Sequence, residues 1–321
     1  AYAASKFGCK ATIVMPTVTP LIKVNRTKAY GADILLHGDV YDDSYEQAVK
    51  IAEEQGLTFI HPFDDIDVAA GQGTIAMEIV QELPTVDYII VPVGGGGLVT
   101  GISTLAKMLN PKIKVIGVEP KSADSMTAAL KKGEPVTLPS ANTIADGTAV
   151  KRVGSNIFPY CKENISQMIT VEDDKLIGAF LDMVENHKMI VENSGLLPVS
   201  ALEQLDLTGK KAVLVLSGGN MDVITMSSVV QHGLIQKDRI FTVSVLLPDK
   251  AGELVKVAST IAGANGNVIK LEHNQFVSIN RNASVELRIT MEAYGTEHKQ
   301  KILKALDEKG YKPKVVDTKL Y

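Results

Sequence analysis

Short apolar segments alternate with amphipathic segments from the start of the chain to about residue 216. The apolar segments are mostly Val, Ile and Leu without strict alternation, which is typical of strands covered by helices on both faces. The pattern predicts strands at residues 11–15, 33–36, 58–60, 87–92, 113–118 and 211–216, and helices at residues 20–30, 44–55, 67–82, 98–109, 173–188 and 197–205, with residues 150–170 less regular. Repeated βα units of this kind predict a doubly wound α/β fold around a parallel sheet.

The pattern changes near Gly233, where residues 231–239 form a polar segment without core periodicity. Such a segment indicates a connector. Beyond it, the sequence predicts strands at residues 241–246, 267–274, 283–291 and 314–317, and helices at residues 252–262 and 297–309. The order βαββαβ is that of a ferredoxin-like unit, and its length is that of a separate small domain.

Composition narrows the classes of partner. The chain has 321 residues, of which 45% are hydrophobic and 22% charged, and its net charge is −4. This balance predicts a globular protein without the basic surface that nucleic acid or an anionic membrane requires. Its two cysteines are too few for a disulfide scaffold or a zinc cluster and predict a reducing, cytoplasmic location. The most apolar stretch, residues 88–102, is too short to span a bilayer.

The strongest chemical signal is a run of four glycines between a predicted strand and a predicted helix, made of Gly94, Gly95, Gly96 and Gly97. Consecutive glycines let backbone N–H groups converge on one anion, and the start of a helix adds a partial positive charge. We therefore favour a phosphate site, although the spacing is neither that of a Walker loop nor that of a dinucleotide fingerprint. The alternative is a close crossing of strand and helix.

A second glycine turn, Ser217-Gly-Gly-Asn, ends the last predicted strand of the first region. In an open parallel sheet the ligand lies beyond the carboxyl ends of the strands. Both glycine turns are therefore expected at one edge of the sheet. The alternative for Ser217 is a capping role for the next helix.

Five motifs in register carry a family resemblance. They are VPVGGGGL at 91–98, LSGGN at 216–220, HPFDD at 61–65, AGQGT at 70–74 and TIADG at 143–147. Residues 1 to about 235 resemble the pyridoxal-phosphate-dependent threonine dehydratases (threonine ammonia-lyases), with serine racemase and serine dehydratase as nearer cousins. The resemblance implies the two-lobed, tryptophan-synthase β-like fold (fold type II), with residues 1–60 as the remainder of the small lobe and 61–235 as the large lobe.

The resemblance also implies a cofactor site. It assigns the amides of Gly94, Gly95, Gly96, Gly97 and Leu98 to the phosphate of pyridoxal 5'-phosphate, the Ser217 hydroxyl to the pyridine nitrogen, and Glu192 to the far edge of the ring. A hydroxyl partner does not force that nitrogen to be protonated, which makes the ring a milder electron sink and suits β-elimination. The alternative for Glu192 is a buried carboxylate that caps a helix.

The lysine to which this family binds its cofactor covalently has no counterpart in this sequence. Threonine dehydratases hold the cofactor as a Schiff base on a lysine in a Ser-Phe-Lys motif, followed by a loop that contacts the substrate carboxylate. Neither motif is present, and the opening Ala-Tyr-Ala-Ala follows that loop in the family. We therefore expect the Schiff-base lysine upstream of Ala1, assign no catalytic residue to this chain, and expect no 2-oxobutanoate formation by the 321-residue chain alone.

Two further sites are implied by resemblance. In serine racemase and related dehydratases a cation is held by a glutamate and a backbone carbonyl, which match Glu119 and Ala123. The next ligand position is Ser125 instead of a carboxylate, which disfavours a structural cation. In the C-terminal region the pattern of Asp249, Gly252 and Asn267 resembles an ACT domain over residues 240–321.

An ACT domain implies an amino-acid sensor, and we expect isoleucine or valine to bind near those residues. The alternative is a dimerisation module that binds nothing, since such sheets often pair across a homodimer or homotetramer. The leading hypothesis is an L-threonine ammonia-lyase that converts threonine to 2-oxobutanoate and ammonia, with serine as a further substrate and regulation through the ACT domain. Serine racemase and a non-catalytic regulatory subunit are the alternatives. Phe63, where serine racemase-like proteins tend to carry Asn, favours the dehydratase.

Overall fold

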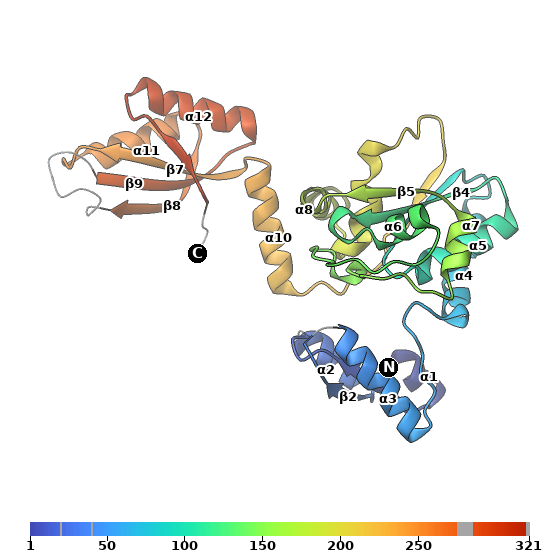
Figure 1. Ribbon diagram of the computed structural model, residues 1–321. Helices are drawn as coiled ribbons and strands as arrows, with labels where there is room; N and C mark the ends of the chain where they lie inside the picture. The colour runs from blue at the N-terminus through green and yellow to red at the C-terminus, as the bar shows by residue number, and fades with distance from the viewer. Residues whose placement is uncertain (20, 40, 275–284, 319–321) are drawn as a thin grey trace. The chain divides into compact units, whose positions relative to one another are not determined.

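The computed structural model describes residues 1–19, 21–39, 41–274 and 285–318. The chain divides into two compact units (Figure 1). The first unit contains Ala1–Ala179 and Met189–Asp222, and the second contains Phe180–Lys188 and Val223–Tyr321. Each unit is described separately below. No helix in the described ranges is both long and apolar enough to cross a membrane.

The first unit is built on a four-stranded parallel sheet in the order β5-β4-β3-β6. Its strands are β3 (Tyr88–Pro92), β4 (Lys114–Pro120), β5 (Ile165–Val171) and β6 (Ala212–Leu214). Side chains of β3 and β4 are buried at nearly every position, as expected for strands covered on both faces. The helices α4 (Ile66–Glu82), α5 (Gly97–Leu109) and α7 (Phe158–Asn164) share one apolar core with these strands.

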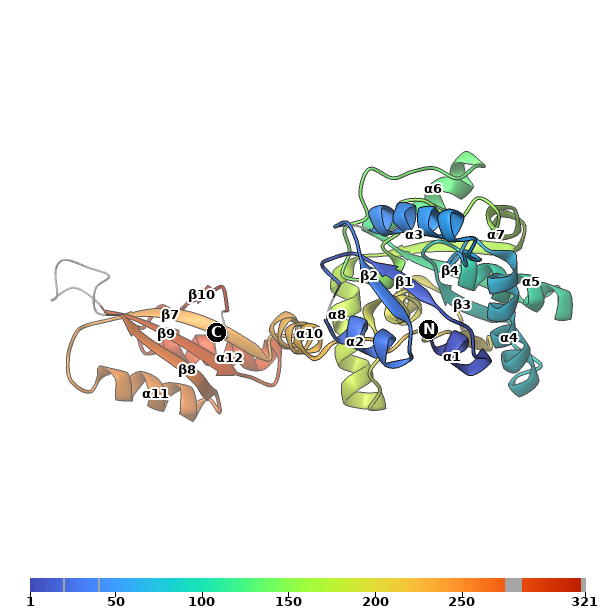
Figure 2. The ribbon, with the colours of Figure 1, turned by 90° about the horizontal axis from the view of Figure 1, so that it is seen from below.

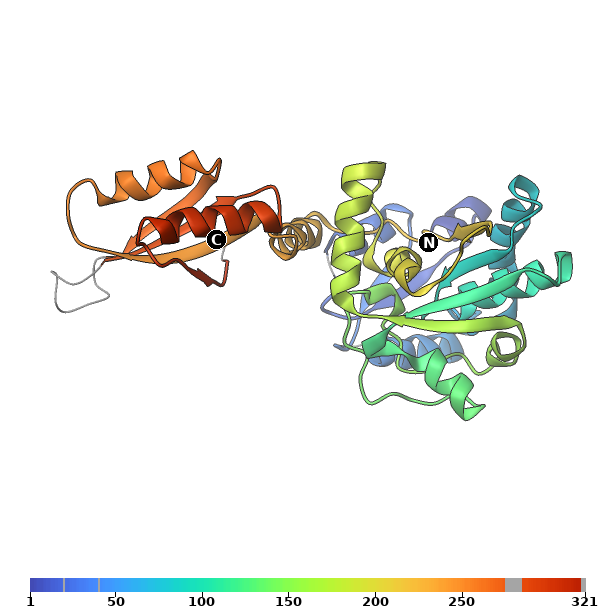
Figure 3. The ribbon, with the colours of Figure 1, turned by 90° about the horizontal axis from the view of Figure 1, so that it is seen from above.

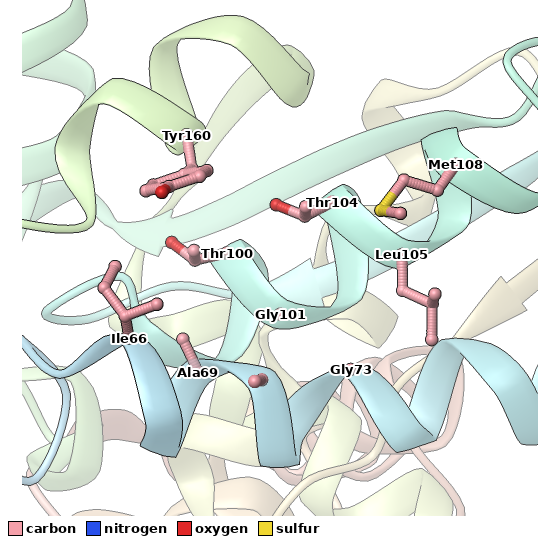
Figure 4. Close-up of a pocket in the computed structure, with 10 residues that line it drawn as sticks. Ile66, Ala69, Gly73, Thr100, Gly101, Thr104, Leu105, Met108 and Tyr160 are labelled. Atoms are coloured by element: carbon pink, nitrogen blue, oxygen red, sulfur yellow. The ribbon is translucent and has the colours of Figure 1, made fainter.

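The helices α4 and α5 approach each other at two glycines. A Cβ atom added to Gly101 would lie 2.0 Å from the carbonyl oxygen of Ala69, and one added to Gly73 would lie 3.2 Å from the carbonyl oxygen of Gly101. Beside this crossing lies a cavity of about 210 Å³ between α4, α5 and α7 (Figure 4). Its lining includes Ile66, Ala69, Thr100, Thr104, Met108 and Tyr160 and no charged side chain.

Residues 1–60 of the first unit contain a separate two-stranded sheet. The strands β1 (Thr12–Met15) and β2 (Asp33–Leu36) pair in parallel, and α1 (Tyr2–Phe7), α2 (Leu21–Ala29) and α3 (Tyr41–Gln55) accompany them (Figure 2). The predicted third strand at residues 58–60 is wrong, since these residues pair with no strand in the described part of the chain. The segment is held through a side chain instead, because the Phe59 ring contacts the Tyr45 ring of α3 at 5.6 Å.

Other predicted elements differ from the observed ones. The segment 150–170, expected to be irregular, contains α7 and most of β5, and α6 (Ser125–Lys132) was not predicted. The predicted helix at 173–188 is α8 (Asp173–Asp182) followed by a π-helical turn, Met183–His187. The predicted helix at 197–205 is broken into α9 (Leu197–Ser200) and a 3₁₀ turn, Leu202–Gln204.

The segment 231–239 is not a simple connector, because α10 (Val223–Gln236) runs through most of it. The boundary between the units accordingly lies at Asp222–Val223, earlier in the chain than residue 235. The helix belongs with the second unit, where it contacts β7 (Ile240–Leu247).

The remaining elements of the second unit follow in the order βαββαβ. After β7 come α11 (Glu253–Gly263), β8 (Asn267–Asn274), β9 (Val285–Glu292), α12 (Thr296–Glu308) and β10 (Lys314–Val316). The four strands form an antiparallel sheet in the order β10-β7-β9-β8. Alternate side chains of β7 and β9 form one core with α11 and α12, so both helices cover one face of this sheet (Figure 3). Residues 283 and 284, predicted to begin a strand, lie outside the described residues.

Candidate functional site

The four-glycine loop follows the carboxyl end of β3 and leads directly into α5. Gly96 has φ of 106°, a left-handed conformation that favours glycine. A Cβ added to Gly95 would lie 2.2 Å from the Phe63 ring, and one added to Gly97 would lie 2.8 Å from the Phe63 carbonyl oxygen. Close packing of the 61–65 motif against the loop therefore explains part of the need for glycine.

The backbone amides of this loop point to a second reason. The N–H groups of Gly94, Gly95, Gly96, Gly97 and Leu98 donate to no acceptor among the residues that the structure describes. Two of the loop's carbonyl groups, by contrast, accept hydrogen bonds: Gly154 donates to the Gly95 oxygen at 3.0 Å, and Thr100 donates to the Gly96 oxygen at 2.9 Å. Buried amides are normally hydrogen-bonded, and five free donors at the start of a 13-residue helix fit a phosphate.

Ser217 lies at the same edge of the sheet. The strands β3 and β6 are parallel neighbours, and the Val215 amide extends their pairing by donating to the Ile90 oxygen at 2.9 Å. The half-buried Ser217 hydroxyl has no hydrogen-bond partner in the described ranges. The alternative capping role is wrong, because the next helix, α10, begins only at Val223.

Glu192 lies against the turn that follows Ser217. Its Oε2 atom accepts a hydrogen bond from the Asn220 amide at 3.2 Å, and a Cβ added to Gly218 would lie 2.2 Å from Oε1. Although Glu192 precedes a 3₁₀ turn, its side chain makes no capping hydrogen bond, which contradicts the alternative of a helix cap. Burial raises the pKa of Glu192, nearby Asp146 also raises it, and Lys23 lowers it.

Two neighbours of Glu192 were not identified from the sequence. Asn193 and Ser194 are buried, and the Asn193 Oδ1 and Ser194 Oγ atoms have no partner among the described residues. The Asn193 side-chain amide donates to the Ile144 oxygen at 2.9 Å, and a Cβ added to Gly147 would lie 2.9 Å from Ser194 Oγ. The 143–147 motif and the segment after Glu192 therefore line one site. The sequence carried no signal for these contacts beyond the position of Asn193 and Ser194 next to Glu192.

Glu119 and Ala123 are both fully buried. The Glu119 carboxylate accepts hydrogen bonds from the Met126 amide at 2.6 Å, the Thr127 amide at 2.9 Å and the Thr127 hydroxyl at 2.8 Å. Burial raises the pKa of Glu119 to about 7, while these hydrogen bonds act in the opposite direction. The described residues contain no group of three His, Cys, Asp or Glu side chains that could hold a metal ion. A cation at Glu119 and Ala123 stays a prediction.

The three predicted effector residues do not come together within one chain. Asp249 and Gly252 follow the end of β7, and Gly252, with φ of 91°, precedes α11. Asn267 is the first residue of β8, and its side chain donates to Glu292 at 2.7 Å. Because β7 and β8 are both antiparallel to β9, they run in the same direction, and Asn267 lies level with the start of β7 on the far side of β9. At 3.3 Å per residue, the two ends of β7 are roughly 20 Å apart.

Comparison with known proteins adds to this geometry. A model of the family described as "Pyridoxal-phosphate dependent enzyme" matches residues 1–218. The chain is 41% identical over 314 residues to an L-threonine ammonia-lyase of Geobacter sulfurreducens, a match that covers 97% of this chain and 78% of that protein.

Two solved structures are similar to this chain. The processed form of threonine deaminase isoform 2 from Solanum lycopersicum has 38% identity and a TM-score of 0.68, covering 72% of this chain and 68% of that one. Serine racemase from Dictyostelium discoideum has 37% identity and a TM-score of 0.63, covering 69% of this chain and 72% of that one.

Proposed function

Because this chain belongs to the family of pyridoxal-phosphate-dependent enzymes, we propose that it is an L-threonine ammonia-lyase, which converts threonine to 2-oxobutanoate and ammonia. One observation carries the proposal. The match to the Geobacter sulfurreducens L-threonine ammonia-lyase covers 97% of this chain, so it extends beyond the cofactor-binding region into the second unit. Serine, which lacks only the methyl group of threonine, is proposed as a further substrate.

The glycine loop is proposed to hold the cofactor phosphate. The five free amides from Gly94 to Leu98 can each donate to a phosphate oxygen, and the start of α5 contributes its partial positive charge. No lysine or arginine side chain is needed for this, because backbone donors in a fixed concave arrangement form an anion site by themselves. When bound, the cofactor supplies an electron sink for the electrons that remain on the amino acid after its α-proton is removed.

Ser217 and Glu192 are proposed to set the environment of the cofactor ring. The Ser217 hydroxyl is uncharged and is free to donate or accept a hydrogen bond, so it orients a ring nitrogen without fixing a positive charge there. The raised pKa of Glu192 keeps its carboxyl protonated over a wider range of pH than usual. A protonated carboxyl donates a hydrogen bond instead of adding a negative charge to the site.

The proposal is tested by product analysis with the protein expressed from its complete reading frame and loaded with pyridoxal phosphate. We expect 2-oxobutanoate from L-threonine and, at a lower rate, pyruvate from L-serine. Serine racemase is the second candidate, supported by the similarity to the Dictyostelium discoideum enzyme. Formation of D-serine from L-serine at a rate above that of either elimination would favour the racemase and contradict the lyase.

The second unit is proposed to be an ACT-type regulatory domain that binds isoleucine or valine. Its βαββαβ order supports this, together with the open space beside Gly252, where an added Cβ would meet nothing within 4 Å. Since Gly252 and Asn267 lie at opposite ends of the sheet, an effector that touches both must lie between two copies of the unit, which accords with a homodimer or homotetramer.

Titration calorimetry on the whole protein tests the regulatory proposal. We expect heat from isoleucine or valine, and we expect N267A to lose it while N110A, a variant in the first unit, retains it. Absence of heat with wild-type protein would leave the second unit as a dimerisation module.

The cytoplasmic location stays a prediction from the sequence.

A further inference from the structure

A chain of aromatic rings connects α3 to the glycine loop. The rings of Tyr41 and Tyr45 stack at 6.3 Å, and Tyr45 contacts the His61 ring at 5.5 Å. The His61 ring in turn meets the Phe63 ring edge-on at 4.6 Å, and Phe63 packs against Gly95. The imidazole of His61 lies immediately before the Phe63 ring that contacts the loop, and its charge can change near neutral pH, so its protonation state is important.

The hydrogen bonds of His61 define its protonation state. Its Nδ1 atom accepts from the Phe63 amide at 3.2 Å and from the Asp64 amide at 2.8 Å. An imidazole nitrogen that accepts hydrogen bonds carries no proton, so the ring is neutral, with its proton on Nε2. These two bonds close the turn from residue 61 to residue 64.

That turn contacts the glycine loop in two ways. It presents the Phe63 ring and backbone to Gly95 and Gly97. It also directs the Asp64 carboxylate to the amides of residues 155–157, at distances of 3.0, 2.8 and 3.2 Å. The preceding residue of that segment, Gly154, donates to the Gly95 oxygen. Both routes end at Gly95, whose amide is one of the five free donors.

We propose that His61 is a positioning residue for the glycine loop, and that the loop binds the cofactor phosphate tightly only while the His61 imidazole is neutral. A protonated Nδ1 would direct a hydrogen at two amide hydrogens, so both bonds that close the turn would be lost. Phe63 and Asp64 would then no longer be fixed against the loop. The inference rests on the proposed phosphate site.

The groups that face His61 act in both directions. Burial lowers the pKa of His61, whereas the carboxylates of Asp64 and Asp65 raise it. The Tyr45 ring of α3 also faces the His61 ring, at 5.5 Å. The net direction is downward, so protonation begins below the usual range of histidine, and the loss of phosphate binding is expected on the acid side of about pH 6.5.

The test compares wild-type protein with H61N and H61A. Asparagine places its Oδ1 acceptor close to the position of Nδ1 but does not titrate, whereas alanine removes the acceptor. The probe is pyridoxamine 5'-phosphate, which carries the phosphate and ring but no aldehyde and so cannot bond to a lysine. Its dissociation constant is measured at about pH 7.5 and about pH 5 by equilibrium dialysis, on either side of an ordinary histidine pKa.

We expect wild-type affinity to fall roughly tenfold more between the two pH values than H61N affinity, since one linked proton is worth up to tenfold per pH unit. The probe's own phosphate also titrates, and it does so equally in every sample. The change in dissociation constant between the two pH values is therefore compared from one protein to the next. H61A is expected to bind weakly at both pH values. H232N, which changes an exposed histidine of the second unit, should keep the wild-type ratio.

An H61N protein with the wild-type pH ratio would overturn the inference while leaving the phosphate site intact. Failure of every protein to bind the probe would overturn the phosphate site and the inference together. A third measurement needs no ligand: nitrogen-15 spectra of the histidine side chains should show His61 with its proton on Nε2 at neutral pH. A proton on Nδ1 would overturn the inference alone.

Discussion

The crossing of α4 and α5 offers a sharp test of the packing behind the glycine loop. Substitution G101A would place a Cβ 2.0 Å from the carbonyl oxygen of Ala69 and 2.7 Å from the amide of Gly73. Both atoms are backbone, so the neighbour cannot turn aside as a side chain could. Gly71 provides a matched control, because it too lies inside a helix, α4, but a Cβ there would meet nothing within 4 Å. Figure 4 shows Gly101 and Gly73 facing each other across the two helices.

The two substitutions should have opposite signs. Replacing glycine by alanine inside a helix stabilises by about 1 kcal/mol when the site is open, which is the case for G71A. At Gly101 the same gain is opposed by overpacking, which costs about 1–3 kcal/mol. The cost should lie at the upper end of this range, because the atoms in contact are backbone and cannot move aside. A cost of about 2–3 kcal/mol less a gain of about 1 kcal/mol leaves G101A about 1–2 kcal/mol less stable than wild type.

Thermal unfolding followed by circular dichroism measures the difference. For a unit of this size, 1 kcal/mol corresponds to about 2–4 °C in Tm, so G71A should raise Tm by that amount and G101A should lower it by a similar or larger amount. The separation of α5 from α4 in G101A should also weaken pyridoxamine phosphate binding, since α5 carries the loop amides. A G101A protein as stable as G71A would refute the close approach of the two helices.

Glu119, Cys161 and Ser217 carry three further predictions. Since the pKa of Glu119 is about 7 when folded and 4.5 in the unfolded chain, only the folded state keeps the proton between these values. Stability should therefore fall by about 3 kcal/mol as pH rises through this window, and denaturation at pH values on either side should show a flatter profile for E119Q. Burial raises the pKa of Cys161 to about 11, so a thiol reagent should modify only the exposed Cys9 until the protein is unfolded, as checked by mass spectrometry. S217A should lose at most about tenfold in affinity for pyridoxamine phosphate, because the substitution removes one hydrogen bond. A loss of all binding would contradict this role.

The elements next to the glycine loop could be predicted from sequence for physical reasons. The strand β3 is buried on both faces, so its apolar run is continuous, and α4 and α5 are long enough to show helical periodicity. The strand β5 was missed because it lies at the edge of the sheet, where Ser166 and Gln167 are exposed and interrupt the apolar run. The helix α10 was missed in part because only two of its residues, Val229 and Gly233, are buried.

The site could be predicted only where one short segment contains the chemistry. The glycine run and Ser217 each follow a strand directly, so their place at one edge follows from the parallel sheet. Phe63, Asn193 and Ser194 reach the same site from segments far apart in sequence, and no local pattern indicates their contacts. For the same reason the effector residues looked like one cluster, although the antiparallel pairing with β9 puts Asn267 at the opposite end of the sheet from Gly252.

Glu119 shows how one missed helix changes the interpretation of a site. A carboxylate buried at the end of a parallel strand needs hydrogen-bond donors or positive partners, and the resemblance to serine racemase and related dehydratases raised a cation as such a partner, although Ser125 disfavoured it. The start of α6 meets the same need, because its first free amides, from Met126 and Thr127, and the Thr127 hydroxyl all donate to the carboxylate. A cation would have to compete with these donors for the same oxygens. The Met126 side chain also packs against Gly96, so the hydrogen bond from the Met126 amide to Glu119 helps to fix a side chain that contacts the glycine loop.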